Sequence, residues 1–344
     1  MLYNYSGVVH IHTKYSDGSA DLKGIARAAY KSGANFVLIN DHDTLKGLYL
    51  EGECYMHGVL VLVGSEVTPR RNHFLCYDIE TVPSRHLRPE EYVGEVYRQG
   101  GFGFLAHPDQ KENPLFPGRM HWENWDLDMP FGVEIWNFFS QWMGSFKTVK
   151  GLLKSIFFPK ALLKPPHPET LLRWDRLGSV RPVPAIAGVD AHGGRQFNWL
   201  PTIVSSYLHQ FKTLRTHVLT REPLQGDLQK DRRMILSAIK KGRSYLVNHF
   251  AGKVKQFSFY LQHQHRCWHM GEEAQHCPGM VFKIELPEKA HVRIIKDGRL
   301  FSQSTTRFVR LPNPGPGVYR VEVYKGTFWP RPWIFSNHIY VRAS

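Results

Sequence analysis

The sequence predicts an α/β fold over residues 1–250, followed by a small all-β sandwich over residues 251–344. In the first part, strand-like apolar runs alternate with helix-like amphipathic runs. That alternation is typical of a parallel sheet or barrel with helices outside. In the second part, short strands of alternating polarity follow one another between turn signals such as PNPGPG. Regular short strands without helices favour a sandwich of roughly 90 residues.

The elements of the first part are predicted in order along the chain. YSGVVHIH (5–12) is the first strand, and Ser19 or Asp21 could cap the helix that ends at Gly33. A second helix begins near Pro89, and KDRRMILSAIKKG (230–242) closes the first domain. The further strands are expected at FVLIND (36–41), VLVLVGSEV (59–67), HFLCYDI (73–79), GFGFLAHP (101–108), FGVEIWNF (131–138) and VPAIAGVDAH (183–192).

A basic insert at about residues 140–170 interrupts the alternation. Residues 143–164 hold five Lys and no Asp or Glu. Such a segment could lie on an anionic membrane surface as a peripheral contact. Packing over the site or against the barrel is favoured, because the segment is short and Pro159 breaks it.

Composition and charge narrow the functional classes. The four Cys residues form no CxxC pair, and the N-terminus lacks the pattern of a secretory leader, so a cytoplasmic location is expected. No apolar run reaches the length of about 18 residues that a transmembrane segment needs. The formal net charge of +14 attracts anions, which suits a phosphorylated small molecule or nucleic acid, although a basic protein without such a partner is equally compatible.

His, Asp or Glu recurs where the predicted strands end. Side chains two apart on a strand point the same way, so His10 and His12 could aim at one point. The full set of candidate metal ligands is His10, His12, Asp17, His42, Glu66, His73, His107, Asp190 and His192. Nine ligands exceed the needs of one tetrahedral zinc and suffice for two or three ions. Imidazole with carboxylate, and no thiolate, suits zinc, iron or manganese.

The order HxH, SDG, DH, GxE, a following His, AHP and DxH over residues 8–192 resembles the polymerase-and-histidinol-phosphatase (PHP) metal-dependent phosphoesterases. The resemblance implies a distorted seven-stranded (β/α) TIM-like barrel with a trinuclear site. It implies three ligand groups, which are His10, His12, Glu66 and Asp190; Glu66, His73 and His107; and Asp17, His42 and His192. DAHGG, KKGRSYL and RPWIFSNHIYV are similar to a PHP subgroup with an Ig-like C-terminal β-domain, some members of which hydrolyse carbamate esters.

The expected activity is hydrolysis of a phosphate ester by a metal-bridging hydroxide that attacks phosphorus in line. The substrate could be a nucleotide, an oligonucleotide or a small phosphorylated metabolite. The expected catalytic residues are Asp43, His192 and Arg195. Asp41 and Asp43 could orient an imidazole or relay a proton. Arg70, Arg71 and Arg119 are, with Arg195, candidates to bind phosphate.

Two alternative functions stay open. The same site could hydrolyse a carbamate or other ester, or the chain could be a non-catalytic metal-binding scaffold. Elsewhere, HQHRCWHM (263–270) could hold zinc, but its spacing fits no closed four-ligand motif and an exposed hairpin explains it equally well. Glu134, at a strand end, could support the main site without being a ligand.

Overall fold

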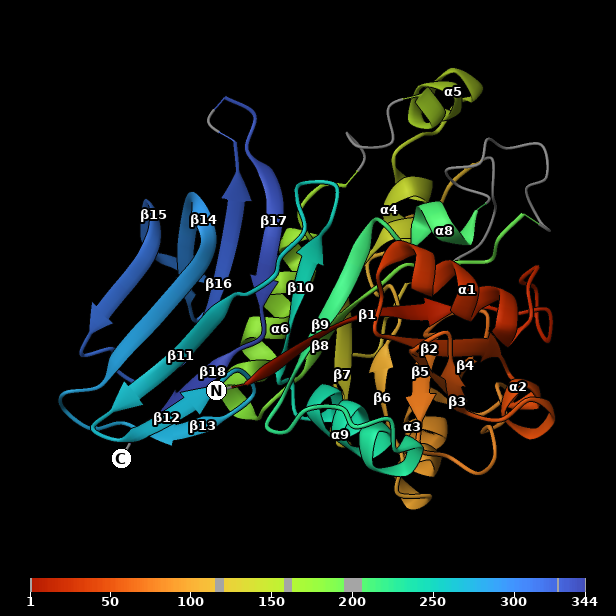
Figure 1. Ribbon diagram of the computed structural model, residues 1–344, viewed down its shortest axis with the longest axis horizontal. Helices are drawn as coiled ribbons and strands as arrows, with labels where there is room; N and C mark the ends of the chain where they lie inside the picture. The colour runs from red at the N-terminus through yellow and green to blue at the C-terminus, as the bar shows by residue number, and fades with distance from the viewer. Residues whose placement is uncertain (1, 115–120, 158–162, 195–205, 327, 344) are drawn as a thin grey trace.

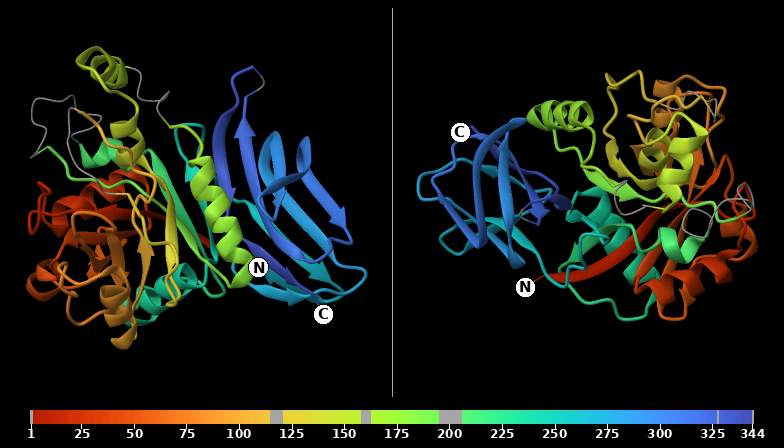
Figure 2. Two further views of the ribbon diagram at one scale, coloured as in Figure 1. Left: turned by 180° about the vertical axis from the view of Figure 1, so that it is seen from behind. Right: turned by 90° about the horizontal axis from the view of Figure 1, so that it is seen from above.

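A computed structural model describes residues 2–114, 121–157, 163–194, 206–326 and 328–343 of the protein. A mixed α/β part from the N-terminal two thirds of the chain lies beside a layered part made of C-terminal strands (Figure 1 and Figure 2). The predicted succession of an α/β region and an antiparallel β region is confirmed.

The α/β part is a closed barrel. Its strands, in spatial order, are β1 (Tyr3–Ile11), β2 (Phe36–His42), β4 (Val59–Val67), β5 (Phe74–Tyr77), β6 (Phe102–Leu105), β7 (Gly132–Asn137) and β8 (Ala185–Gly188). The chain after β8 returns to β1, where the Val189 and Ala191 amides donate to the Val9 and His10 carbonyls and close the ring. β5 runs antiparallel to both neighbours, because a short helix-free connection joins it to β4.

Three further strands continue the sheet from the parts of β1 and β4 that lie outside the ring. β3 (Cys54–Met56) is antiparallel to β4, and β9 (Leu214–Thr220) is antiparallel to β1. β10 (Ser244–Asn248) pairs with β9 on one side and with β17 (Arg331–Ser336) on the other. The sheet therefore continues from the barrel into the C-terminal strands, and the domain boundary near residue 250 stays a prediction.

The helices are α1 (Leu22–Ser32), α2 (Lys46–Leu50), α3 (Pro89–Arg98), α4 (Phe138–Gly144), α5 (Val149–Phe157), α6 (Pro168–Val180), α8 (Tyr207–Gln210) and α9 (Leu228–Lys240). Of the two predicted caps of α1, Asp21 takes the role, accepting from the Gly24 amide at 2.9 Å. Gly33 ends that helix at φ 79°, a left-handed conformation that glycine adopts without strain. Among the described residues, no helix has the length and apolarity that crossing a membrane requires.

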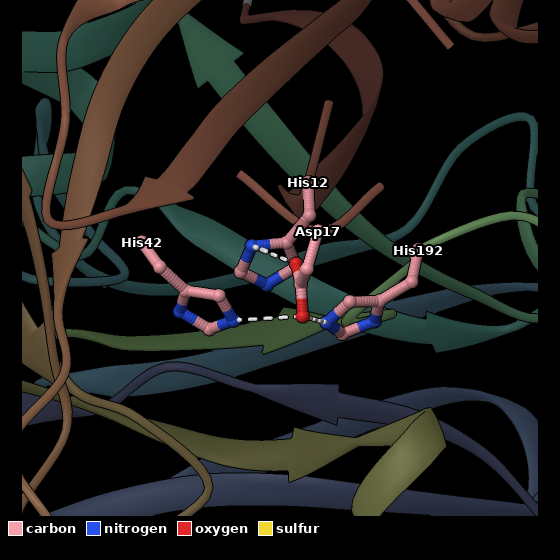
Figure 3. A group of neighbouring side chains, drawn as sticks. All are labelled: His12, Asp17, His42 and His192. Carbon is pink, nitrogen blue, oxygen red and sulfur yellow. Dashed lines mark ion pairs between the residues drawn. The ribbon is translucent and has the colours of Figure 1, made fainter. Parts of the chain in front are cut away.

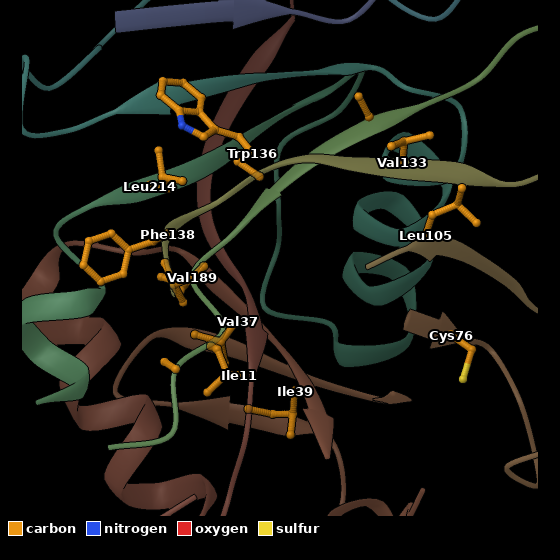
Figure 4. Packing of buried hydrophobic residues seen from close by; sticks show 14 of the residues in the cluster. Ile11, Val37, Ile39, Cys76, Leu105, Val133, Trp136, Phe138, Val189 and Leu214 are labelled. Atoms are coloured by element: carbon orange, nitrogen blue, oxygen red, sulfur yellow. The ribbon is translucent and has the colours of Figure 1, made fainter. Parts of the chain in front are cut away.

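Apolar side chains of the barrel strands form a continuous buried core (Figure 4). Ile11, Ile39 and Val189 are fully or almost fully buried in it, near the ends of their strands. Burial of each such side chain stabilises the fold by about 1.5–3 kcal/mol relative to exposure. The core thus holds in place the strand ends from which the polar residues project.

The C-terminal strands are β11 (Ser258–His263), β12 (Arg266–His269), β13 (Glu273–Gln275), β14 (Val281–Lys296), β15 (Arg299–Pro312), β16 (Gly317–Lys325), β17 and β18 (Ile339–Arg342). β14 and β15 form a hairpin whose turn, Asp297–Gly298, has positive φ at both residues, as a two-residue hairpin loop requires. β14 pairs with β11 along its first half and with β16 along its second. All but one of the pairings among these strands are antiparallel, the exception being β13 with β18.

A buried charge network joins α6 to the C-terminal strands. Arg320 of β16 donates twice to the Asp175 carboxylate, at 2.8 and 3.0 Å, and His338 lies 2.8 Å from the same carboxylate. Arg320 also contacts Glu322 at 2.6 Å. Each of these side chains is almost completely buried, so the network is shielded from solvent.

The basic insert forms α4 and α5 in its described residues. Phe138 and Trp142 of α4 are buried, whereas Val149 and Leu153 of α5 are 63% and 51% exposed. The two helices therefore differ: α4 packs on the barrel and α5 stands away from it (Figure 1).

Candidate metal centre

The structure brings all nine predicted ligands to one end of the barrel. His10, His12 and Asp17 come from the end of β1 and the following loop, and His42 and Glu66 from β2 and β4. His73 precedes β5, His107 follows β6, and Asp190 and His192 follow β8. Three overlapping groups have ligand atoms close enough to share an ion, namely His12, Asp17, His42 and His192; His10, Glu66 and His107; and His10, His12 and Asp190.

Glu66 lies at the centre of the cluster and is almost completely buried. Its Oε1 is 3.0 Å from His73 Nδ1 and 3.2 Å from His107 Nε2. Its Oε2 is 3.0 Å from His42 Nδ1 and 3.4 Å from His10 Nε2. The two oxygens of one carboxylate therefore face two different sets of imidazoles.

Asp17 organises the group nearest to solvent (Figure 3). Its Oδ2 is 3.4 Å from the Nε2 atoms of both His42 and His192, and its Oδ1 is 3.9 Å from His12 Nδ1. The side chains of Asp17 and His42 are 32% and 25% exposed, against 0% for His10. This edge of the cluster is therefore where solvent reaches it.

Asp190 completes the buried side of the cluster. Its Oδ1 is 3.1 Å from His12 Nε2 and 3.5 Å from His10 Nε2. His12 thus stands between the buried carboxylate of Asp190 and the more exposed carboxylate of Asp17. A single imidazole is shared in this way by two of the three groups.

The backbone is strained at three of the nine residues. His10, His107 and Asp190 have φ values of 64°, 28° and 54°, in a region that costs of order 1–3 kcal/mol for residues other than glycine. At His10 the pairing of β1 with β2 shifts register between Val9 and Ile11, and the regular strand ends at Ile11. His10 and His12 do converge, but the predicted cause, regular strand alternation, is wrong. An irregularity at His10 brings the ring centroids within 5.1 Å.

Glu134 supports the cluster from β7. Its Oε1 is 2.9 Å from His10 Nδ1, and its Oε2 accepts from the His107 amide at 2.7 Å and from the Asn137 side chain at 2.9 Å. Glu134 thus orients the ring of His10 and the backbone of His107. A second partner of this kind raises the basicity of a metal-binding imidazole.

Asp41 and Asp43 have different surroundings, although both flank His42. Asp41 accepts from the Thr13 amide and hydroxyl at 2.7 and 2.6 Å and from the Ser16 hydroxyl at 2.6 Å. It therefore holds the loop that carries Asp17, rather than contacting an imidazole. Asp43 accepts from the Thr68 amide at 2.9 Å and from Arg85 at 3.3 Å, beside the cluster, and its catalytic role stays a prediction.

Of the predicted phosphate-binding arginines, the structure describes only Arg70 and Arg71, and neither forms a hydrogen bond or ion pair with a residue of the cluster. Arg195 and Arg119 lie outside the described residues, Arg71 pairs with Glu123, and Arg70 is exposed. The sequence reasoning missed Phe139 of α4, whose ring centroid is 5.5 Å from that of His192. Phe139 lies just before the basic insert, and a lone apolar ring there gave no signal of this position.

Burial and charge set the protonation of the cluster. Burial, and then the neighbouring His192 and His42, lower the pKa of His12 to about 3. Burial raises the pKa of Glu66, but the surrounding imidazoles outweigh it and hold that pKa well below its ordinary value. Burial lowers the pKa of His42 as well, but the carboxylates of Glu66 and Asp17 outweigh it and raise that pKa to about 11. His42 would therefore lose a proton on binding a cation, since neutral imidazoles and ionised carboxylates are the forms that bind metal.

Several donor atoms fit a cation. His12 Nδ1 is buried and has no hydrogen-bond partner, and His10 Nε2 and Glu66 Oε2, although they lie 3.4 Å apart, are buried without a neighbour in hydrogen-bonding geometry. Buried polar atoms are nearly always satisfied, so an orphaned group of this kind indicates a missing ion or water. The donor set is nitrogen and oxygen, as zinc, manganese and iron prefer.

The histidines of the C-terminal hairpin do not gather in this way. His263 ends β11 and His269 ends β12, while His265 and Cys267 are exposed. Throughout the described part of the chain, groups able to hold an ion occur only at the barrel. The zinc interpretation of HQHRCWHM is not supported.

The fold and the site together define a mixed α/β barrel protein with buried His, Asp and Glu clusters consistent with a multi-metal site. No family model matches the chain. An uncharacterized protein of Methanocaldococcus jannaschii is 27% identical over 181 residues, which span 48% of this chain and 96% of that protein.

The solved structures found by comparison resemble this chain only weakly. A two-domain protein from Bacteroides vulgatus, described as containing a predicted PHP-like metal-dependent phosphoesterase, aligns with 99% of this chain and 95% of its own, at a TM-score of 0.44 and 15% identity. An amidohydrolase from Chromobacterium violaceum aligns with 54% of this chain and 87% of its own, at a TM-score of 0.31 and 14% identity. Similarities at this level carry no argument about activity, which depends here on the side chains themselves.

Proposed function

We propose that the protein is a metal-dependent phosphoesterase that hydrolyses phosphate esters. In this proposal residues 1–250 form the catalytic (β/α) barrel, and residues 251–344 form an accessory β-sandwich. The observation that carries the proposal is the position of Glu66, one carboxylate with each oxygen facing a different set of imidazoles. That arrangement suits a ligand shared by two cations.

The nine side chains would hold two or three divalent cations, of zinc, manganese or iron. Bound there, such ions supply Lewis acidity that lowers the pKa of water and neutralises charge on phosphoryl oxygens. The groups would be His10, His12, Glu66 and Asp190; Glu66, His73 and His107; and Asp17, His42 and His192. The position of Asp17 and His42 at the solvent edge supports substrate entry beside the third group.

The protein's own residues would position and protect the reacting groups. Glu134 holds His10 and His107, and Asp41 holds the loop of Asp17. Asp43 would relay a proton toward the leaving oxygen, and His192 and Arg195 would act at the phosphoryl group. The net charge of +14 supports a phosphorylated small molecule or a short nucleic acid as the substrate.

The test couples metal analysis of the purified protein to a panel of phosphate monoesters, phosphate diesters and aryl carbamates. We expect bound divalent metal and phosphate-ester hydrolysis in the wild type, and loss of both in His10→Ala/His12→Ala. The matched control is His263→Ala/His265→Ala, which removes two histidines from the C-terminal hairpin.

Three outcomes contradict the proposal, each in a different way. Full activity in His10→Ala/His12→Ala rules out the site. Turnover of aryl carbamates without phosphate esters selects the carbamate or ester hydrolase. Bound metal without turnover of either class selects a metal-binding scaffold.

A further inference from the structure

A cavity of about 530 Å³ lies beside α9, at the opposite end of the barrel from the metal centre. Phe102, which lines the cavity, begins β6, whereas His107 follows the end of that strand. The two positions are five residues apart along the chain, four residues of it in the strand, which is at most about 16 Å at about 3.3 Å per residue. The cavity is therefore separate from the metal cluster.

The lining of the cavity is strongly basic. Two acidic residues and five cationic residues contribute to it, the latter being Arg221, Lys230, Arg233, Lys240 and Arg243. Both acids already have cationic partners, since Asp78 pairs with Arg232, and Glu222 pairs with Lys230 at 3.1 Å. The cavity thus carries an excess of positive charge.

The pairing of the remaining cations is incomplete. Arg221 and Arg243 share one carboxylate, Glu272, at 3.1 and 3.7 Å. Arg243 Nε is buried without a hydrogen-bond acceptor. Within the described ranges, Arg233 and Lys240 have no carboxylate within ion-pair distance. Arg233 and Lys240 are exposed, so a bound anion would replace water at these two side chains.

The helix dipole of α9 explains the placement of only one of these cations. Lys240 lies in the last turn of the helix, where a cation is favourable. Arg233 lies near the middle of α9 and Arg221 precedes the helix, so neither is placed to complement its C-terminus. Their shared feature is the cavity that they line.

The floor of the cavity is apolar. Phe102 and Leu236 are buried there and Met234 is half-buried, while Lys240 Nζ lies 5.4 Å from the centroid of the Phe102 ring. A ligand that matches both the cationic lining and the apolar floor carries several negative charges together with an apolar group. The volume is that of an ordinary small-molecule site, about 300–1,000 Å³.

We propose that this cavity binds a small organic di- or triphosphate, of the nucleotide type, at a site distinct from the metal centre. Arginine and lysine around its mouth bind the phosphates, and Met234 and the apolar floor contact the organic part. The cavity shares no lining residue with the cluster, so its ligand would not contact the proposed metal ligands.

The test is calorimetric titration of the full chain with ADP, ATP and inorganic triphosphate, in the wild type and in Arg233→Glu/Lys240→Glu. We expect the double reversal to weaken binding at least about tenfold, which is about 1.4 kcal/mol. The control is Arg299→Glu/Arg310→Glu, an equal change of net charge at two exposed arginines of β15. Arg233→Gln/Lys240→Gln is a milder pair for use if the reversal unfolds the protein.

The site is established if the cavity variants weaken binding while the β15 control and His10→Ala/His12→Ala do not. Tighter binding of ADP or ATP than of inorganic triphosphate would show that the apolar floor is used. The proposal is overturned if no probe binds below about 1 mM. It is also overturned if the control weakens binding equally, or if binding disappears only in His10→Ala/His12→Ala.

Discussion

Two stretches of this chain place histidines at alternate positions, and the structure treats them differently. In residues 8–18, His10 and His12 are completely buried and face carboxylates from other strands. In residues 263–270, the histidines lie on the β11–β12 hairpin, where His265 and Cys267 are exposed. Only the first stretch contributes to a group able to hold an ion.

The comparison shows that histidine spacing alone does not make a metal site. What distinguishes the barrel stretch is a set of carboxylates supplied from distant parts of the chain, chiefly Glu66 and Asp190. The hairpin has the imidazoles without converging acids, and its positive φ falls at Gln264 in the turn, not at a histidine as it does at His10. Burial, neighbouring carboxylates and backbone conformation all favour an ion site in residues 8–18, and they do not in residues 263–270.

The largest expected effect comes from Glu66→Gln. It removes the charge that faces both sets of imidazoles, so we expect loss of bound metal and a fall in hydrolysis of more than about 100-fold, beyond the range for residues that only support ligands. Metal analysis and kcat/KM measure the effect. Glu80→Gln, at an exposed position, is the control. Wild-type metal content in Glu66→Gln would show that this carboxylate does not distinguish the barrel stretch from the hairpin.

A smaller effect is expected from Glu134→Gln. The variant keeps the size of the side chain but weakens its hold on His10 and His107, which should lower metal affinity by about 10–100-fold. Competition with a chelator measures the affinity, and excess metal should restore activity. An affinity equal to that of the Glu80→Gln control would show that Glu134 is only a buried hydrogen-bonding group.

Asp175→Asn tests whether the two regions depend on one another. Removing one partner from a buried charge network costs about 3–5 kcal/mol, so the unfolding free energy at pH 7 should fall by about that amount. Urea unfolding measures the change, with Asp128→Asn at an exposed position as the control. Two separate unfolding transitions would show that the barrel and the C-terminal strands fold independently.

The same network predicts a pH dependence. Burial raises the pKa of Asp175, but Arg320 and His338 outweigh it, and the net shift is downward. The stabilisation is therefore complete above the unfolded pKa of about 3.9 and is lost as pH falls through the lower folded value. Urea unfolding between pH 2 and 7 should show this loss in the wild type and a smaller loss in Asp175→Asn, where carboxylates such as Glu66 still contribute.

The smallest effect is expected from His263→Ala/His265→Ala. These side chains belong to no ion-holding group, so metal content and hydrolysis should match those of the wild type. The unfolding free energy should change by no more than about 0.5 kcal/mol, as for most surface substitutions. Loss of one equivalent of metal would show that the hairpin does bind an ion and that the comparison is wrong.

The sequence by itself determined the type of the main elements of residues 1–250 and the chemistry of the strand ends, but it did not predict such elements as β3, β9, α2 and α4. Apolar runs and caps such as Asp21 act locally, through side-chain period and nearby hydrogen bonds, and so can be read without a structure. The same is true of the nine donors, whose positions beside strand ends predicted that they would lie together. The cytoplasmic location and the role of Arg195 stay predictions.

Only the tertiary structure decided how the donors meet. Glu66 comes between two sets of imidazoles because β1, β2, β5 and β6 bring histidines to it from both sides. Asp190 joins His10 and His12 because the chain after β8 returns to β1, a contact between residues about 180 positions apart. The left-handed turn at His10, the support from Glu134 and the link from Asp175 to Arg320 likewise depend on partners distant in sequence. Such contacts form only once the whole core is packed, and no local pattern of residues encodes them.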